Sequence, residues 1–341
     1  MKKDFQLLLL LFLIATIHLP ESVWAGVGMV TGFRTGTYIQ FGNDIANVAE
    51  NYGLMIDVKE SEGSISNIER MNSRENAAFG IVQSDVMGFL LQKEPEIAQK
   101  LSMIFPFYSE EVHILTSKKN RRISDLKGKS ISTGTQGSGS WLTFANLRHI
   151  MDINPVHEVN NLEPLDALIA VLEGKIDALI YVAGKPVKLF SKLELLYQNP
   201  DYRPLIEQVH FLPLNDSKML RKYYVESRIM PSDYSWLKEQ TPTIAVKALL
   251  VSYDFSTHQS PYYESRCRQI GRLAGIIREN FNYLKENGHE KWKAVDLDAE
   301  IGSWKQDACS QPIVPAKNEP KIVPRKNESK ISRKLREIFQ E

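Results

Sequence analysis

Along the first third of the chain, short apolar runs alternate with segments whose apolar residues recur at helical spacing. Ile45, Val48 and Ala49 share one face of such a segment, and Gly53 marks its expected end. The apolar runs, which predict strands, cover residues 27–32, 54–60, 77–83 and 111–117. Strands and helices in this alternating order predict a mostly parallel sheet that is covered by helices on both faces.

A second unit with the same alternation begins after residue 117. Ser124 is expected to cap a single helical turn, and Gly288 to end a long helix that begins near residue 260. The expected strands are 129–133, 156–160, 176–182 and 209–214, with 243–254 as a strand or an extended return, and the expected helices include 141–151 and 163–175. A body of roughly 285 residues is too long for one small core, so we expect two domains.

The first residues have the features of a secretory signal peptide, which we place at 1–25. Lys2 and Lys3 supply a positive start, the apolar core at 7–17 is short for a membrane span, and cleavage is expected after Ala25. An uncleaved anchor is the alternative. No later apolar run has membrane length, so we expect an exported protein that resides in the periplasm.

The last residues differ in composition from the body of the protein. The segment PIVPAKNE at 312–319 is echoed by KIVPRKNE at 321–328, and few residues nearby are aromatic. Such a composition cannot bury enough apolar surface to offset the entropy of ordering, so we predict that 312–341 is a disordered tail. The tail is basic, and it either contacts an anionic lipid or an acidic partner or is simply solvated.

Metal and nucleotide cofactors are not expected from the motifs that the sequence contains. The two cysteines, Cys267 and Cys309, cannot form a zinc finger, but an oxidising compartment permits a disulfide between them. The seven histidines form no HExxH motif. The loop GFRTGT lacks the lysine of a P-loop, and GTQGSG does not match the dinucleotide-binding pattern GxGxxG.

Four polar segments follow predicted strands, and each one precedes a predicted helix. They are TGFRTGTY at 31–38, SEGS at 61–64, QSD at 83–85 and GTQGSGS at 134–140. In open α/β sheets, ligands bind at the carboxyl ends of strands, where helix N-termini offer free amide groups and a positive dipole end. Several such segments together indicate a small anionic ligand, most simply a carboxylate.

The sequence contains no arrangement typical of an enzyme active site. Neither Ser138 nor Ser140 lies in a GxSxG motif, and the two SxxK matches lack the KTG motif that should accompany them. Glu110 and Glu111 are adjacent carboxylates, but neighbouring residues of a strand point to opposite faces of the sheet. We therefore expect a binding protein rather than an enzyme.

Taken as a set, five segments of this chain resemble the TAXI-type solute receptors of TRAP transporters, which typically read TGxxxGTYYxxG near their start. In chain order the segments are TGFRTGTYIQFGNDIA, ESEGSISNIERM, AAFGIVQSDV, LKGKSISTGTQGSGS and DALIAVLEGKIDALIYVAGKPV. The matches extend over roughly residues 27–255, and the C-terminal helices are less diagnostic.

This resemblance implies an α/β, two-lobed type II periplasmic-binding-protein fold, in which two lobes close on a ligand about a hinge. The first lobe is expected to contain 26–117 plus 245–311, and the second lobe 118–244. Family ligands include glutamate and related amino or dicarboxylic acids. The implied partners are a small-molecule carboxylate and a membrane permease, with no nucleic acid, and we expect a monomer.

The resemblance also transfers the family's binding loops to this chain. The implied ligand-binding residues are Gly36, Thr37, Tyr38, Ser64, Gln83, Ser84, Asp85, Ser138, Gly139, Ser140, Ala183 and Pro186. Amides after Gly36 would bind a carboxylate oxygen, Tyr38 would cover the ligand stem, and Asp85 would meet an α-ammonium. Ser84 or Asp85 is alternatively only a helix cap, and Tyr38 alternatively packs in the first turn of its helix. Gly36 and Gly139 alternatively serve only their turns.

Arg34 departs from the family pattern, which has a small or neutral residue at this position. Its guanidinium either forks onto a second ligand carboxylate or faces solvent. Phe33 replaces a glycine, which leaves the identity of the ligand open. The sequence therefore predicts either a receptor that feeds a TRAP permease or a receptor of the same fold that signals to a membrane sensor subunit.

Overall fold

One long sheet runs through the whole body of the protein. The computed structural model describes residues 26–311, except residues 35, 74, 76, 155, 218–223 and 303. The strands are β1 Val27–Val30, β2 Ile56–Lys59, β3 Ala77–Gln83, β4 Leu101–Ser117, β5 Ser130–Ser132, β6 His157–Val159, β7 Ala178–Ala183, β8 Val209–Phe211, β9 Val225–Ile229 and β10 Thr241–Tyr253. The strand order is β2-β1-β3-β10-β4-β7-β5-β6, with β8 beside β4 and β9 beside β10.

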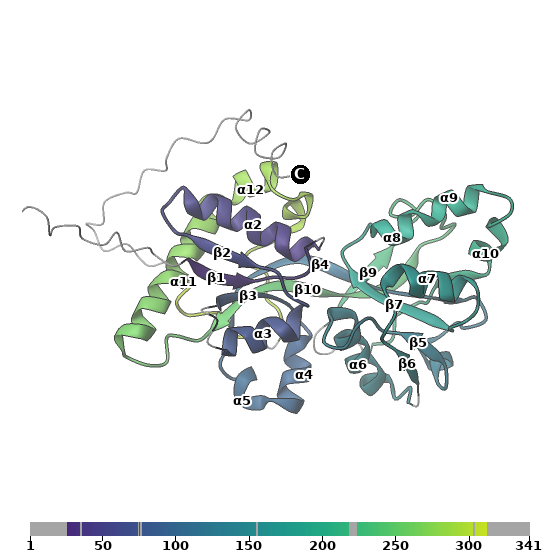
Figure 1. Cartoon of the computed structure of the whole chain (residues 1–341), viewed down its shortest axis with the longest axis horizontal. Helices are drawn as coiled ribbons and strands as arrows, with labels where there is room; N and C mark the ends of the chain where they lie inside the picture. Colours follow the sequence, from purple (N-terminus) through teal and green to yellow (C-terminus); the bar gives the residue numbers. More distant parts are fainter. Residues whose placement is uncertain are drawn as a thin grey trace, which may run out of the picture.

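The helices cover both faces of this sheet, as the alternating pattern predicts (Figure 1). In the first half of the chain they are α2 Thr37–Glu50, α3 Ser64–Asn72, α4 Val86–Lys93, α5 Pro95–Ala98, the 3₁₀ turn η1 Ile123–Leu126, α6 Gly139–Met151 and α7 Pro164–Leu172. In the second half they are α8 Lys188–Ser191, α9 Leu193–Gln198, α10 Arg203–Glu207, α11 Pro261–Glu279, α12 Phe281–Asn287 and the 3₁₀ segment η3 Glu290–Ala294.

The sheet divides into two lobes that repeat one topology. The first lobe contains the parallel trio β2-β1-β3, and the second lobe contains the parallel trio β6-β5-β7. In each trio, the strand that comes first in the chain lies in the middle. The antiparallel strands β4 and β10 pass from one lobe to the other (Figure 1). The chain is thus a two-lobed α/β protein, and the lobes are joined by two long crossing strands.

Each lobe has its own hydrophobic core on both faces of the sheet. In the first lobe, Phe41 of α2, Phe79 of β3 and Trp292 of η3 are fully buried in one core, and Ile68 of α3 belongs to the core on the opposite face. The second lobe repeats this arrangement, with Phe144 of α6 among the buried residues of one core. Burial of both faces explains why the strands read as nearly continuous apolar runs.

The strand β4 is ten residues longer than the prediction, which began at residue 111. Its N-terminal half contains Pro106, a residue that normally indicates a break or an irregularity in a strand. The structure accommodates this proline at a shift in the β4–β10 register, where Pro106 lies opposite Leu249. The resulting 17-residue strand is long enough to serve both lobes.

The predicted helix from about 260 to 286 is two helices in the structure, and this prediction was therefore wrong in its continuity. Asn280 separates α11 from α12 with a ψ of 12°, which is outside the helical range. Its side-chain amide donates to the carbonyl of Ile276 and to the hydroxyl of Tyr52. Asn280 thereby fixes the start of α12 against the end of α2. The strand β9 is a separate difference, because the sequence analysis did not predict a strand there.

Three expectations about the ends of the chain have different outcomes. Cys267 of α11 and Cys309 form a disulfide, which attaches the end of the described chain to that helix. The expected signal peptide at 1–25 and the expected tail at 312–341 lie outside the described residues. Within the described part of the chain, no helix has the length and apolar character needed to cross a membrane.

Candidate functional site

Glu110 is the centre of a buried polar cluster at the point where β4 passes between the lobes. The hydroxyl of Tyr38 donates to Glu110 Oε2 at 2.8 Å, and the hydroxyl of Tyr108 donates to Oε1 at 3.5 Å. The side chain of Gln83 also hydrogen-bonds to this carboxylate. We call Tyr38, Gln83, Tyr108, Glu110 and Lys291 the crossing-strand cluster. Four separate segments of the chain contribute to it.

Burial raises the pKa of Glu110 to about 7, because the charged form loses its hydration. The hydrogen bond from Tyr38 and the positive charge of Lys291 act in the opposite direction, and the nearby Asp85 adds to the rise. Burial and the adjacent Glu110 likewise raise the pKa values of Tyr38 and Tyr108 well above their ordinary values, so both phenols stay neutral donors. Glu110 therefore changes charge near neutral pH.

The position of each side chain follows from the end of a strand or the start of a helix. Gly36 is the N-cap of α2, which places Tyr38 in the first turn of that helix. Gln83 is the last residue of β3, at its carboxyl end. Glu110 pairs with Val246 of β10 one residue before β4 begins to pair with β7. The site thus lies where open α/β sheets bind ligands.

Gln83 contacts the second lobe at the start of α6. A Cβ atom built on Gly139 would lie 2.4 Å from Gln83 Oε1 and 2.7 Å from its Cδ, so only glycine fits here without a shift. The same oxygen is buried and has no hydrogen-bond partner. The amide of Gln83 therefore packs directly against the first residue of α6, where helix amide groups are free.

Replacement of Gly139 by alanine is expected to lower the free energy of unfolding by about 1–3 kcal/mol, because the added methyl group overpacks this contact. The control is Gly275→Ala in α11, where nothing lies within 4 Å of an added Cβ. Urea unfolding of both variants provides the measurement. In a Gln83→Ala background the cost should fall, and equal costs in both backgrounds would contradict the contact.

Asp85 attaches the first lobe to the second through its side chain. Its Oδ2 accepts hydrogen bonds from the hydroxyls of Thr143 in α6, at 2.8 Å, and of Tyr224, at 3.0 Å. The side-chain amide of Asn146, also in α6, donates to the Asp85 carbonyl. Asp85 is fully buried, and this burial raises its pKa to about 6. The expected cap of α4 is not present, because the Asp85 side chain makes no cap hydrogen bond.

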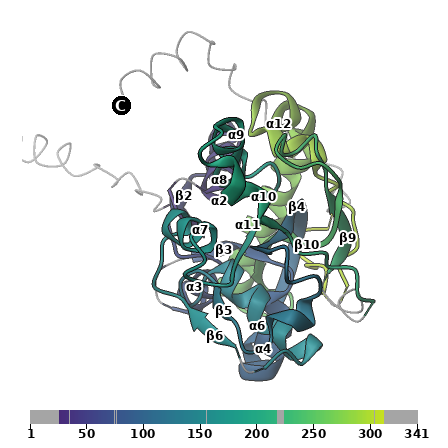
Figure 2. The same cartoon turned by 90° about the vertical axis from the view of Figure 1, so that its right-hand side faces the viewer.

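Because of this contact, α4 and α6 lie side by side at the lower end of both views (Figures 1 and 2). A second contact between the lobes comes from η3. Lys291 Nζ donates to the carbonyl of Gly184, just after β7, at 2.6 Å, and lies 5.1 Å from the centre of the Tyr108 ring. The lobes are therefore joined by side chains on either side of the crossing strands.

The other predicted residues mostly bind backbone groups of their neighbours. Ser64 Oγ accepts from the amide of Gln83, Ser84 Oγ from Lys247, Ser138 Oγ from Trp141 and Ser140 Oγ from Val182, at 2.9, 3.0, 3.3 and 2.9 Å. Thr37 hydrogen-bonds to Tyr108 and so joins the edge of the cluster. The side chains of the serines hold the strand ends in place, and their roles toward a ligand stay predictions.

Arg34, Ala183 and Pro186 make no contact with the cluster that the structure shows. Arg34 is 85 % exposed at its side chain and pairs with Glu60 at 3.5 Å. Ala183 is the last residue of β7 and lies opposite Glu111, and Pro186 is exposed three residues later. A ligand role for these residues stays a prediction.

The sequence analysis did not select Glu110 or Lys291 as binding residues. The sequence does contain a feature that could have identified Glu110: a charged residue in a buried, mostly apolar strand requires polar partners. As the alternation of the strand predicts, its neighbour Glu111 faces another environment, where it accepts from the amide of Lys185 and the hydroxyl of Ser227, both at 3.1 Å. Lys291 has no motif around it that could have identified it.

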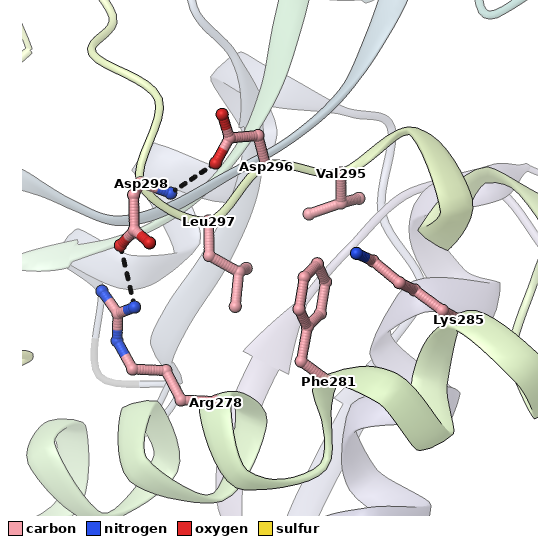
Figure 3. Close-up of a pocket in the computed structure, with 7 residues that line it drawn as sticks. All are labelled: Arg278, Phe281, Lys285, Val295, Asp296, Leu297 and Asp298. Atoms are coloured by element: carbon pink, nitrogen blue, oxygen red, sulfur yellow. Dashed lines mark hydrogen bonds and ion pairs between the residues drawn. The ribbon is translucent and has the colours of Figure 1, made fainter.

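A surface pocket of about 310 Å³ lies elsewhere in the first lobe (Figure 3). It is lined by residues of α11 and α12 and by 295–298, and Arg278 pairs with Asp298 at its edge at 2.8 Å. The pocket shares no residue with the crossing-strand cluster. Among the described residues, no group of three or more His, Cys, Asp or Glu side chains is arranged to hold a metal ion.

The strand order and the two lobes define the class of fold: this is a two-lobed α/β protein with the type II periplasmic-binding-protein fold. The chain belongs to the NMT1-like family, whose model matches residues 29–263. No curated protein matches the sequence. The narrower assignment to TAXI-type receptors rests on the sequence segments alone.

Solved structures with a similar fold are periplasmic binding proteins and receptor cores. One is the periplasmic sulfonate-binding protein SsuA of a putative sulfonate ABC transporter from Methylobacillus flagellatus KT. The two chains are 12% identical with a TM-score of 0.45, and the match covers 76% of this chain and 69% of SsuA. The GluR0 ligand-binding core from Nostoc punctiforme, in complex with L-glutamate, has 14% identity, 76% and 98% coverage and a TM-score of 0.42. ArtJ from Geobacillus stearothermophilus, an arginine-, lysine- and histidine-binding protein, has 15% identity, 76% and 94% coverage and a TM-score of 0.41. Since these scores are below 0.5, the strand order of this chain carries the fold assignment.

Proposed function

We propose that this protein is an extracytoplasmic solute receptor, which binds a small carboxylate between its two lobes and delivers it to a TRAP-type permease. The observation that carries the proposal is the crossing-strand cluster. Buried polar side chains from β3 and β4 and partly buried ones from α2 and η3 meet there, and the start of α6 in the second lobe closes against them. A ligand at this position touches both lobes and can therefore stabilise their closure.

Free amide groups support the choice of a carboxylate as the bound group. Helix α2 begins at Thr37 and α6 at Gly139, and the first turn of each helix presents amides without partners inside the helix. The positive end of each helix dipole favours an anion. The site is proposed to operate without a cofactor and without catalysis.

Binding of the right acid is expected to raise the thermal stability of the full chain. A ligand at 100 times its dissociation constant adds about 2.7 kcal/mol, which shifts the unfolding midpoint by several degrees. The measurement is a thermal scan against a panel of amino acids and dicarboxylates. The shift should be lost in Thr37→Ala and Ser140→Ala and kept in Ser235→Ala, whose hydroxyl is exposed and bonds to Glu194. A folded protein that no acid stabilises would contradict the proposal.

Delivery to a TRAP-type permease is proposed from the resemblance of the five sequence segments. Such a permease uses an ion gradient and not ATP. Uptake of the identified ligand by cells that contain this protein should therefore fail when an ionophore removes the gradient. Normal uptake in cells that lack the protein would instead favour a receptor that signals to a membrane sensor.

A further inference from the structure

The two lobes meet on the α4–α6 side through a fully buried contact. Leu142 of α6, in the second lobe, is 0 % exposed and belongs to a hydrophobic core of the first lobe, together with Val86 and Leu90 of α4. The ring of Trp141 meets the ring of Phe89 in α4 edge-on, with centroids 5.9 Å apart. Separation of the lobes here would expose core side chains to water, which opposes opening on this side.

Polar groups strengthen the same contact. Asp85, Thr143 and Asn146 are buried, and the two residues of α6 donate to the carboxylate and the carbonyl of Asp85. The preceding residue, Ser84, is attached to β10, because its amide donates to the carbonyl of Lys247 at 2.8 Å and its Oγ accepts from the Lys247 amide at 3.0 Å. The contact therefore lies beside a crossing strand, where a rotation of one lobe moves atoms least. We call this contact, made by residues 85–90 and 141–146, the α4–α6 joint.

The contact on the η3 side is polar and only partly buried. Lys291 is partly exposed, and its ammonium donates to the carbonyl of Gly184 in the second lobe at 2.6 Å. Glu110 attracts the same ammonium, so Lys291 keeps a charged partner when Gly184 moves away. Burial, the adjacent Lys291 and, from the second lobe, Lys188 of α8 lower the pKa of His289, so Lys188 and His289 do not attract each other. Among the described residues, opening on this side breaks polar contacts, which water can replace.

We infer that the lobes open on one side only: the α4–α6 joint stays closed, and the hydrogen bond from Lys291 to Gly184 is a latch that breaks when a ligand enters or leaves. The inference rests on the proposed function only in that a bound ligand requires the lobes to move, and it adds where the entrance lies. In both views α8 and α12, the helix before η3, lie at the upper end, and α4 and α6 lie at the lower end (Figures 1 and 2). The ligand therefore enters between η3 and α8.

Distances between pairs of spin labels test this inference in the ligand-free full chain. Glu290→Cys in η3 with Lys188→Cys in α8 reports on the latch, and Gln92→Cys in α4 with His149→Cys in α6 reports on the joint. All four positions are exposed, so nitroxide labels fit there. The two native cysteines are bonded to each other and do not take a label. Pulsed electron paramagnetic resonance measures both distances.

Lys291→Ala removes the latch, and Lys293→Ala is the matched control, because Lys293 is an exposed lysine of the same 3₁₀ segment. Loss of a hydrogen bond from a charged group should raise the ratio of open to closed protein by about tenfold in Lys291→Ala. A second, longer distance between the labels at 188 and 290 would show this change. The distance between the labels at 92 and 149 should stay the same in both variants.

An unchanged distance between 188 and 290 in Lys291→Ala, relative to Lys293→Ala, would overturn the latch. A longer distance between 92 and 149 would overturn the joint, because the lobes would then separate on both sides. Neither outcome depends on the identity of the ligand. If the labels behave as expected but no acid stabilises the protein in the thermal scan, the proposed function fails while the one-sided opening stands.

Discussion

Ionisation of Asp85 and Glu110 is expected to lower the free energy of unfolding of the ligand-free protein as the pH rises from about 4 to about 7, relative to a variant in which neither group ionises. Asp85 and Glu110 cause this loss, because burial raises their pKa values from 3.8 to about 6 and from 4.5 to about 7. Each of these pKa shifts corresponds to a loss of roughly 3 kcal/mol of stability once the carboxyl group is fully ionised. The two acids repel each other, so their contributions are not simply additive.

The direction follows from proton linkage. Between pH 4 and pH 7 these two carboxyls bind more protons in the folded state than in the unfolded chain, since each folded-state pKa lies above the unfolded value. His113 acts in the opposite direction, because burial lowers its pKa from 6.5 to about 4. The contribution of these two carboxyls to the free energy of unfolding must then fall with pH over this range. The stability that these two groups contribute is complete below about pH 4 and is lost as the pH passes their folded-state values.

Urea unfolding at intervals from pH 4 to pH 8 measures this dependence. In the double variant Asp85→Asn and Glu110→Gln neither replacement ionises, so the free energy of unfolding of the wild-type protein should fall relative to that of the variant as the pH rises. Glu60→Gln, which removes a carboxylate from the surface, serves as the control and should keep the slope. A difference between the wild-type protein and the double variant that does not change with pH would show that these acids are ionised in the folded state at little cost.

Local sequence patterns predicted those parts of the site that depend on neighbouring residues. The strand over 77–83 has the predicted bounds, and Gln83 at its end was selected because polar residues at strand ends meet ligands. The glycine of the GTQGSGS loop was also selected, and Gly139 lies against Gln83 in the structure. These residues are positioned by their own strand or helix, which periodicity reveals.

The remaining parts of the site depend on contacts between residues far apart in the chain. Glu110 was set aside because it faces away from Glu111, and that alternation is correct. However, Tyr38, the partner of Glu110, lies 72 residues away, and Lys291 lies 107 residues from Gly184. No local pattern records such pairings, which the strand order and the return of η3 to the crossing strands create.

Replacement of Trp292 by alanine is expected to cost about 3–5 kcal/mol of stability, because the ring is fully buried. It stacks on Phe41 of α2 with ring centroids 4.3 Å apart and meets Phe107 of β4 edge-on at 5.3 Å. Its indole nitrogen donates to Asp44 Oδ2 at 2.8 Å. These contacts attach η3 to the first lobe, so their loss should also displace the adjacent Lys291 from Gly184.

Trp236→Ala is the control that separates a general loss of stability from the displacement of Lys291. Trp236 is a buried tryptophan of the second lobe, and its indole donates to the carbonyl of Phe190 at 2.9 Å. Both variants should unfold at lower urea concentration, but only Trp292→Ala should weaken ligand binding under conditions where each protein is folded. Where the alanine variant does not fold, Trp292→Phe keeps the ring stacking and loses the indole donor, and a smaller loss of both properties is expected. Equal loss of binding in the Trp236 variant would mean that general destabilisation, rather than the position of Lys291, controls the closure of the two lobes.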